Sequence, residues 1–600
     1  MTPRQLFIGL CAVFLTPAIQ ANPTQVYFGD LHLHTRYSND AFAFFGTSRT
    51  PDDAYRYARG KSITTNDGRS IRLSAPLDFM AVTEHMRYPG ALWHIAQPES
   101  PYHNTDIGRM ITSNNVGDRF GAFFEVLKPA RFTHEEAIEG LDVPERSEST
   151  WQLLINAADD HYKPGRFTTF AAYEWTAEVQ RLPSRPVGNM HRVVLFEDTK
   201  DLPYPFSSID SIHPERLWDY LEFHRARGVD AIAIPHNTNI SDGLMFAPLD
   251  SWGKPITEHY AARRTWNEPL VEVTQQKGTP ETHPALSPND DFADFELRRE
   301  LFGSQQEGRL VGSYVRDAYQ RGLEFEAWGF FNPFQFGLIG ATDYHRALSA
   351  PSENRVNEDP EPAAARAIRP GSSMGGSAGG LTAIWATDNN RQALFDAMRR
   401  REAYATTGPR ISVRLFAGWQ YDEHVMEQKH WVDVAYERGV PMGGSLVRTR
   451  ETGPDAAPIL LISAAMDPNG GALDRIQVIK GSIDNGQSIE RIYNVALSGD
   501  RKLNADGSAE PVGNSVDLDN ATWSNDIGAS TLSVRWRDPD FDPESPAFYY
   551  VRVLEIPTPR WQVYDAIAVG RPIPEGPPTT IQERAFTSPI WYEVNRPRHP

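Results

Sequence analysis

Short apolar runs alternate with longer amphipathic segments over the first two thirds of the chain. The apolar runs have the length of strands and occupy residues 26–31, 77–82, 167–173, 192–196, 231–235, 270–273 and 336–341. Helices are expected at residues 51–59, 214–227, 292–302, 313–328 and 390–401. Pro51 and Pro214 suit the first turn of a helix, and Gly60 and Gly228 suit its end. This alternation predicts an α/β fold, with βα units around a mostly parallel sheet or barrel.

The pattern changes after about Gly408. Strands are expected at residues 411–416, 431–436, 458–465, 474–479, 491–497, 531–536 and 548–556. Turn signals such as Pro468-Asn469-Gly470-Gly471 separate them, which predicts a β-sandwich-like region. Because 600 residues exceed what one hydrophobic core usually supports, we expect two domains, residues 22–408 and 409–600.

Two polar, irregular stretches interrupt the α/β pattern, at residues 90–162 and 241–267. Long insertions of this kind are binding loops or lids, or they only decorate the surface. Residues 353–380 are rich in Pro, Ala, Gly and Ser, which predicts a mobile loop.

The N-terminus has the pattern of a secretory signal peptide, residues 1–21. Arg4 supplies the positive charge, residues 6–15 the apolar run and Ala21 the small residue at the cleavage site. The alternative is an uncleaved anchor, although the run is short for a membrane span. No later stretch is long and apolar enough to cross a membrane, so the expected location is periplasmic or secreted, without stable membrane insertion. Cys11 is the only cysteine, so the mature chain must bind any metal through His, Asp and Glu.

The chain is acidic, with a net charge of −19 and a pI near 5.4. It lacks the basic surface expected of a nucleic-acid-binding protein, so no nucleic-acid partner is expected. An anionic substrate would be repelled at long range, so a phosphate-like substrate would need local compensation by metal ions.

Side chains that commonly bind metals lie at the ends of the apolar runs. His32 and His34 end the first run, and Asp343 and His345 close the last one. Residues two apart in an extended strand point to the same face, so each pair can reach one ion. The other strand-end candidates are His85, Glu174, His191 and His236, of which His191 opens its strand. A lone histidine is weak evidence, but two spaced pairs at strand ends predict a metal site where α/β proteins build their active sites.

These motifs resemble a known superfamily. Gly-Asp-Leu-His-Leu-His-Thr at residues 29–35, Thr-Glu-His at 83–85 and Thr-Asp-Tyr-His at 342–345 are similar to the PHP (polymerase and histidinol phosphatase) superfamily. Segments 51–60, 380–385, 400–410, 441–444 and 552–557 resemble, more narrowly, the domain-of-unknown-function 3604 branch.

The resemblance implies a distorted, seven-stranded (β/α) PHP-like barrel with insertions and up to three metals. It adds Asp40, six residues after His34, and gives Glu174 the role of a bridging carboxylate. Glu84 departs from the family pattern, but its position is not that of a ligand. The implied ligands are His32, His34, Asp40, His85, Glu174, His191, His236, Asp343 and His345.

Mixed imidazole and carboxylate ligands suit two or three divalent ions, Zn, Mn or Fe. The expected reaction is hydrolysis of a small-molecule, phosphate-type ester by a metal-bound hydroxide. His191, His236 or Asp343 would supply the proton to the leaving group. Arg192, Lys277 and Arg346 are candidate anion-binding residues.

Two alternatives remain open. The same metals could hydrolyse a sulfate ester, a carbamate, a carboxyl ester or an amide, in a pocket lined by Trp93, Trp175, Trp266 and Trp328. Or the metals could be structural, in a binding protein without catalysis, although a structural site normally closes with four ligands. The sequence leaves the substrate, the metal identity and the oligomeric state open.

Overall fold

The computed structural model describes residues 24–65, 68–132, 144–349, 352–355, 377–450 and 452–594. The predicted signal peptide, residues 1–21, lies outside the described residues, and so does most of the predicted loop at 353–380. Within the described part, no helix is long and apolar enough to span a membrane.

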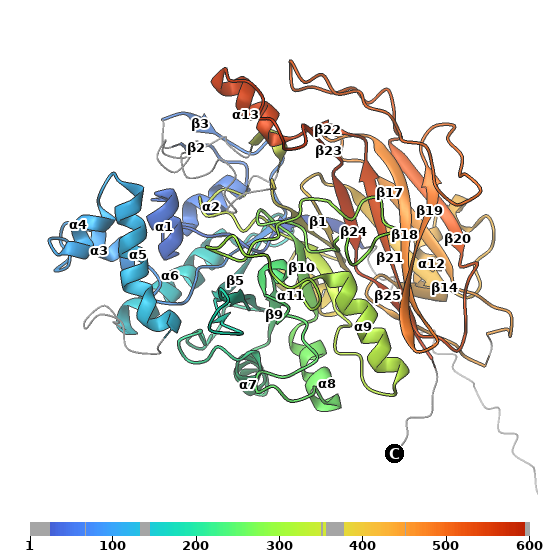
Figure 1. The fold of residues 1–600 in the computed structure, drawn as a ribbon, viewed down its shortest axis with the longest axis horizontal. Helices are drawn as coiled ribbons and strands as arrows, with labels where there is room; N and C mark the ends of the chain where they lie inside the picture. Colours follow the sequence, from blue (N-terminus) through green and yellow to red (C-terminus); the bar gives the residue numbers. More distant parts are fainter. Residues whose placement is uncertain are drawn as a thin grey trace, which may run out of the picture.

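The N-terminal strands form one end of a large mixed sheet (Figure 1). β1 (Gln25–Asp30), β4 (Phe79–Val82) and β5 (Thr168–Trp175) run parallel. β8 (Arg192–Phe196) then pairs antiparallel with β5 and with β9 (Ala231–Pro235). The expectation of a mostly parallel sheet therefore holds only in part. The chain returns from β5 to β8 through a two-stranded turn and not through a helix, and such a connection produces antiparallel strands.

The remaining two predicted strands, β10 (Leu270–Thr274) and β11 (Gly337–Gly340), form a separate parallel pair. A parallel bridge from Leu33 to Tyr344 joins the segment after β1 to the segment after β11. All seven predicted strands are thus present. Closure into a barrel stays a prediction, because no hydrogen-bonded ladder joins β9 to β10 among the described residues.

Four of the five predicted helices are present: α2 (Pro51–Ala58), α7 (Pro214–Arg225), α9 (Val315–Ala327) and α11 (Arg391–Arg399). The fifth prediction, a helix over residues 292–302, is wrong, because this segment consists of turns and irregular backbone. Glu296 there has a φ of 45° and forms an ion pair with Arg560, while Phe295 packs under Arg584. These tertiary contacts override the local helical pattern.

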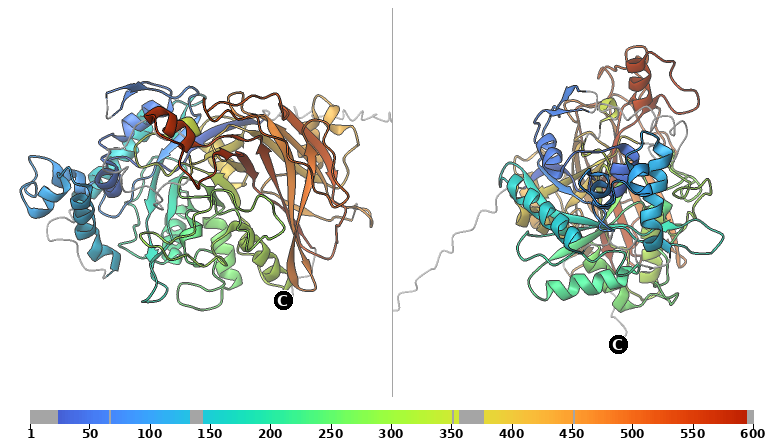
Figure 2. Two further views of the ribbon diagram at one scale, coloured as in Figure 1. Left: turned by 45° about the horizontal axis from the view of Figure 1, so that its top comes forward. Right: turned by 90° about the vertical axis from the view of Figure 1, so that its left-hand side faces the viewer.

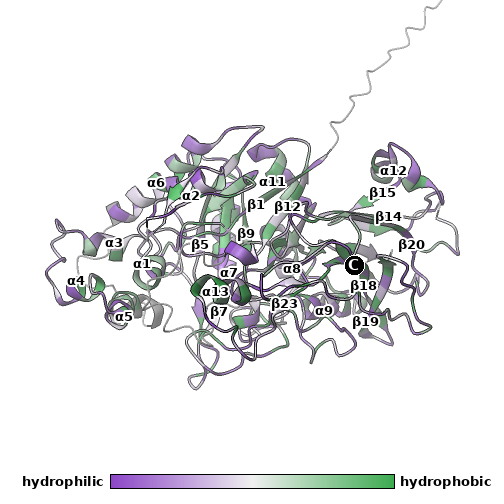
Figure 3. Ribbon diagram, turned by 90° about the horizontal axis from the view of Figure 1, so that it is seen from above, coloured by the Kyte–Doolittle hydropathy of each residue, from purple (hydrophilic) through white to green (hydrophobic). Residues whose placement is uncertain are grey.

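The insertion at residues 90–162 is largely helical and not irregular. It contains α3 (Ala91–Ala96), α4 (Asp106–Ile111), α5 (Val116–Phe132) and α6 (Pro144–His161). Figure 2 shows the first three of these projecting at the end of the molecule away from the C-terminal strands. On α6 the buried residues follow a helical period, Trp151, Leu154, Ile155 and Ala158. Figure 3 shows the corresponding change of hydropathy along this helix. The second insertion, residues 241–267, contains α8 (Glu258–Asn267).

The C-terminal region contains two sheets that face each other across an apolar layer. β14 (Ser412–Gly418), β17 (Ile459–Ala465) and β20 (Thr531–Arg537) belong to one sheet. The facing sheet includes β18 (Leu473–Asp484), β19 (Gln487–Leu497) and β21 (Ala547–Glu555). The layer between them contains Val413, Leu460, Val478 and Val551. This arrangement is sandwich-like, as the alternating pattern predicts.

Hydrogen bonding continues across the predicted domain boundary at residue 408. β12 (Leu381–Ala386) pairs with β1 and with β13 (Ala403–Thr406), which in turn pairs with β24 (Arg584–Thr587). The N-terminal and C-terminal strands therefore share one 13-stranded sheet. The boundary itself stays a prediction.

The strand predicted at residues 431–436 is instead part of α12 (Trp431–Arg438). The rings of Trp431 and Tyr436 lie 6.0 and 4.8 Å from the ring of Phe416 on β14, and Ala435 is buried on the same side. The spacing of these inward residues is helical, although the short apolar run also fits a strand.

Candidate metal centre

The two His-containing motifs lie side by side and are joined by backbone hydrogen bonds. The amide of His34 donates to the carbonyl of Tyr344, and the amide of Asp343 donates to the carbonyl of His32, each at 2.9 Å. Leu31 and Leu33 are buried on the opposite face, so the two imidazoles share one side, with their Nε2 atoms 3.2 Å apart. The period-two expectation for this pair is therefore met.

Asp343 faces both histidines. Its Oδ1 atom lies 3.4 Å from Nε2 of His32 and 3.3 Å from Nε2 of His34. Asp343 has a φ of 52°, in the left-handed region that a non-glycine residue rarely adopts. Its other oxygen, Oδ2, accepts from Nε2 of Gln275 at 2.7 Å and forms an ion pair with Lys277. Strain of this kind is typical of residues held for a function.

Glu174 lies at the centre of the cluster. Its Oε2 atom is 3.3 Å from Nε2 of both His32 and His34 and 3.2 Å from Nδ1 of His85. Its Oε1 atom is 2.7 Å from Nδ1 of His191. One carboxylate therefore contacts imidazoles on both of its oxygens, which is the arrangement that a bridging ligand requires.

Asp40 and His345 complete the cluster from the side of α1 (Asn39–Phe45). Oδ2 of Asp40 lies 3.0 Å from Nε2 of His345 and 3.2 Å from Nε2 of His85. Nε2 of His236 lies 3.6 Å from Oε1 of Glu174. All nine predicted ligands are thus brought together by the strand ends and by the first turn of one helix.

Within the cluster, three overlapping groups have donor atoms that all lie within 4.8 Å of one another. They are His34 with His85 and His345, His32 with Glu174 and His236, and His32 with His34 and Asp343. Each group is of a size and composition that can hold a divalent ion.

Several buried atoms of these residues have no hydrogen-bond partner among the described residues. They are Nε2 of His191, both ring nitrogens of His236 and Oδ1 of Asp343. Buried polar atoms are nearly always paired, so unpaired atoms that converge in one place fit metal ligation. Burial, reinforced by His32, lowers the pKa of His236 to about 3, and burial is also the main reason that the pKa of His345 falls to about 4. These two imidazoles are therefore neutral near pH 7, whereas nearby carboxylates raise the pKa of His32 and of His85 although burial opposes it.

A second set of residues orients the ligands. Nδ1 of His32 lies 2.9 Å from Oε2 of Glu272 on β10, and Nδ1 of His34 lies 2.8 Å from Oγ of Ser38. Thr176 contacts Nδ1 of His85 at 2.7 Å. Glu84 is not among the ligands and accepts from Ser38, as expected of its position. Sequence reasoning missed Glu272, although a charged residue inside the otherwise apolar run of β10 is unusual enough to have indicated it.

The three candidate anion-binding residues lie in different environments. Lys277 reaches the cluster through its ion pair with Asp343. Arg192 follows His191 in the chain, but its guanidinium is buried and donates to Glu268 at 2.9 Å. Arg346 follows His345, and its carbonyl accepts from Arg49. Of the bonds described for these three residues, only that of Lys277 is made to a predicted metal ligand.

The four tryptophans proposed to line a pocket lie in different environments. Trp175 is fully buried beside Arg192, and Trp93 packs against Arg36. Trp266 and Trp328 are exposed on the surface.

Fold and cluster together define an α/β protein with a candidate multinuclear metal centre. The chain belongs to the family described as "Protein of unknown function (DUF3604)", whose model matches residues 21–594. The narrower of the two family resemblances is therefore confirmed. No curated protein matches the chain. A solved structure from Bacteroides vulgatus ATCC 8482 is similar at 10% identity and a TM-score of 0.29, over 89% of this chain and 92% of that one. It is described as a two-domain protein containing a predicted PHP-like metal-dependent phosphoesterase.

Proposed function

We propose that this protein is an exported, metal-dependent hydrolase of phosphate-type esters and a member of the PHP superfamily. The observation that carries the proposal is the convergence of the nine ligand-type side chains, several of them with unpartnered buried atoms. A structural ion needs about four ligands, so nine donors support a centre with more than one ion and a reaction to perform.

The three overlapping groups suggest which ligands would bind each ion. His34, His85 and His345, with Asp40, would hold one ion, and His32, Glu174 and His236 another. His32, His34 and Asp343 offer a third position, so the centre would take two or three ions of Zn, Mn or Fe. Bound ions would supply Lewis acidity and a water molecule whose pKa is lowered towards about 7.

The chain's own residues would handle the remaining steps. Glu174 holds Nδ1 of His191, so Nε2 of that ring is the atom that would either bind an ion or move a proton to the leaving group. Lys277 holds Asp343 in place and adds the positive charge that an anionic ester needs in an acidic protein. Arg346, which follows His345, remains a proposed anion-binding residue, whereas the buried guanidinium of Arg192 is paired with Glu268.

The same centre would also suit a sulfate, carbamate or carboxyl ester or an amide. The second class of function, a metal-stabilised binding protein, is favoured by the extensive C-terminal sheets but not by the excess of ligands.

The decisive experiment combines metal analysis with an ester panel. The purified chain, reconstituted with Zn, Mn or Fe, would be assayed on aryl phosphate, sulfate and carboxyl esters. We expect metal-dependent hydrolysis of the phosphate, lost in a His32→Ala, His34→Ala variant and kept in His430→Ala, which changes an exposed histidine. Hydrolysis of another ester alone would change the bond assigned. Bound metal without any turnover would favour the binding protein.

Export would be tested separately. Mass spectrometry of protein from the periplasm or medium should find a mature N-terminus near residue 22. An intact Met1 in cell-associated protein would contradict cleavage.

A further inference from the structure

A pocket of about 760 Å³ lies next to the candidate metal centre. None of the nine candidate ligands lines it. Met190 and Arg192 belong to its wall, whereas His191 between them directs its Nδ1 atom to Glu174. Residues 190–192 therefore have the pocket on one side and the metal centre on the other. A volume of this size is in the range of pockets that bind small organic molecules.

Two glycines hold the walls of this pocket together. Gly243 and Gly312 have φ values of 77° and 87°, in the region that favours glycine. A Cβ atom on Gly243 would lie 2.6 Å from the carbonyl oxygen of Val311, so a larger residue would push the two segments apart. The amide of Gly243 donates to Oγ of Ser313, and the amide of Phe246 donates to the carbonyl of Gly312, each at 2.9 Å. The pocket is therefore built into the fold.

Aliphatic side chains and methionines form much of the wall. Met190 and Met245 are buried in its inner part. Leu249 and Val311 line the same pocket with 44% and 57% of their surface exposed. Large apolar side chains that stay exposed around a hollow are typical of a surface that binds an apolar group.

The charged side chains in the wall are mostly positive. Among the described residues one acid lines the pocket, Asp250, and its Oδ1 atom accepts from two main-chain amides of the turn that follows. Four arginines line it, although the net charge of the chain is −19: Arg181, Arg192, Arg309 and Arg321. Arg192 is paired with Glu268 at 2.9 Å. Arg321 is paired with Asp317 at 3.0 Å.

The other two, Arg181 and Arg309, are exposed and meet at Gly243. A Cβ atom on this glycine would lie 3.7 Å from Nη1 of Arg181 and 3.2 Å from Cβ of Arg309. Nη1 of Arg181 donates to the carbonyl of Asp242 at 3.4 Å, and the side chain of Arg309 has no hydrogen bond or ion pair within the described part of the chain. The carboxylate of Asp242 is itself paired with Arg185. Two guanidinium groups thus leave positive charge at one edge of an apolar pocket.

We propose that this pocket binds an organic anion with an apolar body, whose carboxylate is held by Arg181 and Arg309. A planar guanidinium matches a carboxylate through two parallel N–H···O bonds, and the aliphatic wall removes the apolar body from water. Because residues 190–192 separate this pocket from the metal centre, its occupation does not depend on bound metal ions.

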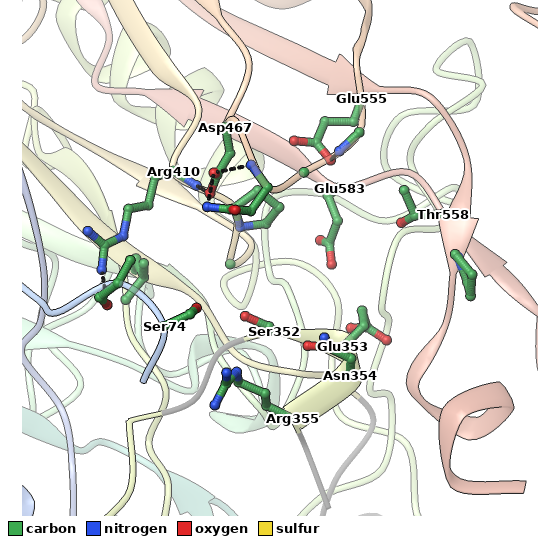
Figure 4. Close-up of a pocket in the computed structure, with 18 of the residues that line it drawn as sticks. Ser74, Ser352, Glu353, Asn354, Arg355, Arg410, Asp467, Glu555, Thr558 and Glu583 are labelled. Carbon is green, nitrogen blue, oxygen red and sulfur yellow. Dashed lines mark hydrogen bonds between the residues drawn. The ribbon is translucent and has the colours of Figure 1, made fainter. Parts of the chain in front are cut away.

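A second pocket, of about 380 Å³, is a poorer site for the same ligand. Figure 4 shows its acidic residues: Glu353, Asp467, Glu555 and Glu583. The guanidinium of Arg410 in its wall donates to the carbonyls of Ala75 and Pro76, each at 2.8 Å. Acidic side chains and an arginine already bound to the main chain offer an anion less than the two exposed guanidinium groups at Gly243 do.

Calorimetric titration of the full purified chain tests this proposal with octanoate, 1-octanol and sulfate. Octanoate has both the negative charge and the apolar body, and each of the other probes has only one of them. We expect octanoate to bind with a Kd below about 1 mM, and the other two to bind at least about tenfold more weakly. An excess of a chelator, which removes ions from the metal centre, should leave the binding of octanoate unchanged.

Three variants locate the bound octanoate. Arg181→Gln and Arg309→Gln should each weaken its binding about tenfold, because each removes a charge-assisted hydrogen bond. Ala247→Trp should abolish binding by filling the pocket. The control Arg571→Gln, which changes an exposed arginine outside the pocket, should bind octanoate like the unmodified chain.

The proposal is overturned if octanoate does not bind, or if 1-octanol or sulfate binds equally well. Loss of binding in the presence of the chelator would overturn it too, because the metal ions would then hold the carboxylate. Unchanged binding in both glutamine variants would place octanoate elsewhere. If thermal unfolding shows that Ala247→Trp does not fold, the two arginine variants decide the question, since both side chains are exposed.

Discussion

Nδ1 of His191 lies 2.7 Å from Oε1 of Glu174. This contact joins the candidate ligand that opens its strand to the one at the centre of the cluster. It directs Oε1 towards His191 and leaves Oε2 towards His32 and His34, each 3.3 Å away. Glu174 therefore connects the ligands that follow β1 with those that follow β7 (Gly188–Asn189) and β9, so the candidate centre depends on both of its oxygens.

Glu174→Gln should disrupt the centre without changing the size of the side chain. The amide of glutamine is neutral, and its NH2 group is a donor where glutamate has a second acceptor oxygen. This NH2 group can neither accept from an imidazole N–H nor bind an ion. We expect at least one metal equivalent per chain to be lost and metal-dependent activity to fall by at least tenfold. Elemental analysis and the ester assay measure this. Glu197→Gln, the same change beyond the end of β8, is the control, and equal losses in both variants would contradict a special role for Glu174.

Glu272→Gln tests the residues that orient the ligands through hydrogen bonds. Oε2 of Glu272 contacts Nδ1 of His32 at 2.9 Å and so fixes the ring with Nε2 towards the cluster. Loss of such a partner typically lowers metal affinity about 10–100-fold. Competition with a chelator measures the change, and an affinity within a factor of two of the unmodified chain would show that the contact is only structural.

Arg552 should be important for stability and not for metal binding. It is fully buried on β21 and contacts Asp290 at 2.6 Å and Glu281 at 3.2 Å. Arg552→Met leaves these carboxylates with less compensation, which we expect to cost about 3–5 kcal/mol of unfolding free energy. Urea unfolding measures this. Arg438→Met breaks an exposed pair with Asp422 and should cost less than about 1 kcal/mol. A similar small cost for both variants would contradict the prediction.

The parts that sequence predicts well are those fixed by local periodicity. His32 with His34 follows from period-two spacing at the end of a buried run. Asp343 and His345 also join the cluster, although Asp343 has a φ of 52° and leaves the extended conformation that the spacing argument assumes. Asp40 lies on a helix that the sequence pattern did not predict, so only the family resemblance indicated it.

The parts that sequence misses depend on distant contacts. Residues 292–302 have a helical pattern, but Arg560 and Arg584 from the far end of the chain hold them in turns. Arg192 is adjacent to His191, yet Glu268 holds its side chain away from the ligands. β12 and β24 join the two regions into one sheet. Which strands they pair with depends on contacts between distant segments, and no local sequence pattern encodes these contacts.

The pH dependence of stability should show that the carboxyl of Asp290 is ionised in the folded protein. Although burial opposes it, the guanidinium groups of Arg552 and Arg316 hold the pKa of this carboxyl far below its usual value. A depressed pKa in the folded state adds stability that is fully present above the unfolded pKa of about 4 and is lost as the pH falls below it. We therefore expect Asp290→Asn to cost about 3–5 kcal/mol at pH 7 and progressively less below about pH 4.

Urea unfolding of the unmodified chain and the variant at pH 7, 5, 4 and 3 measures this difference. Taking the difference between the two chains cancels the acid sensitivity of all the other groups, the metal centre included. Asp484→Asn, at an exposed position, should show a small difference that changes little with pH. A cost of Asp290→Asn that grows on acidification would show that the carboxyl is protonated in the folded protein, and it would contradict the ion-pair network.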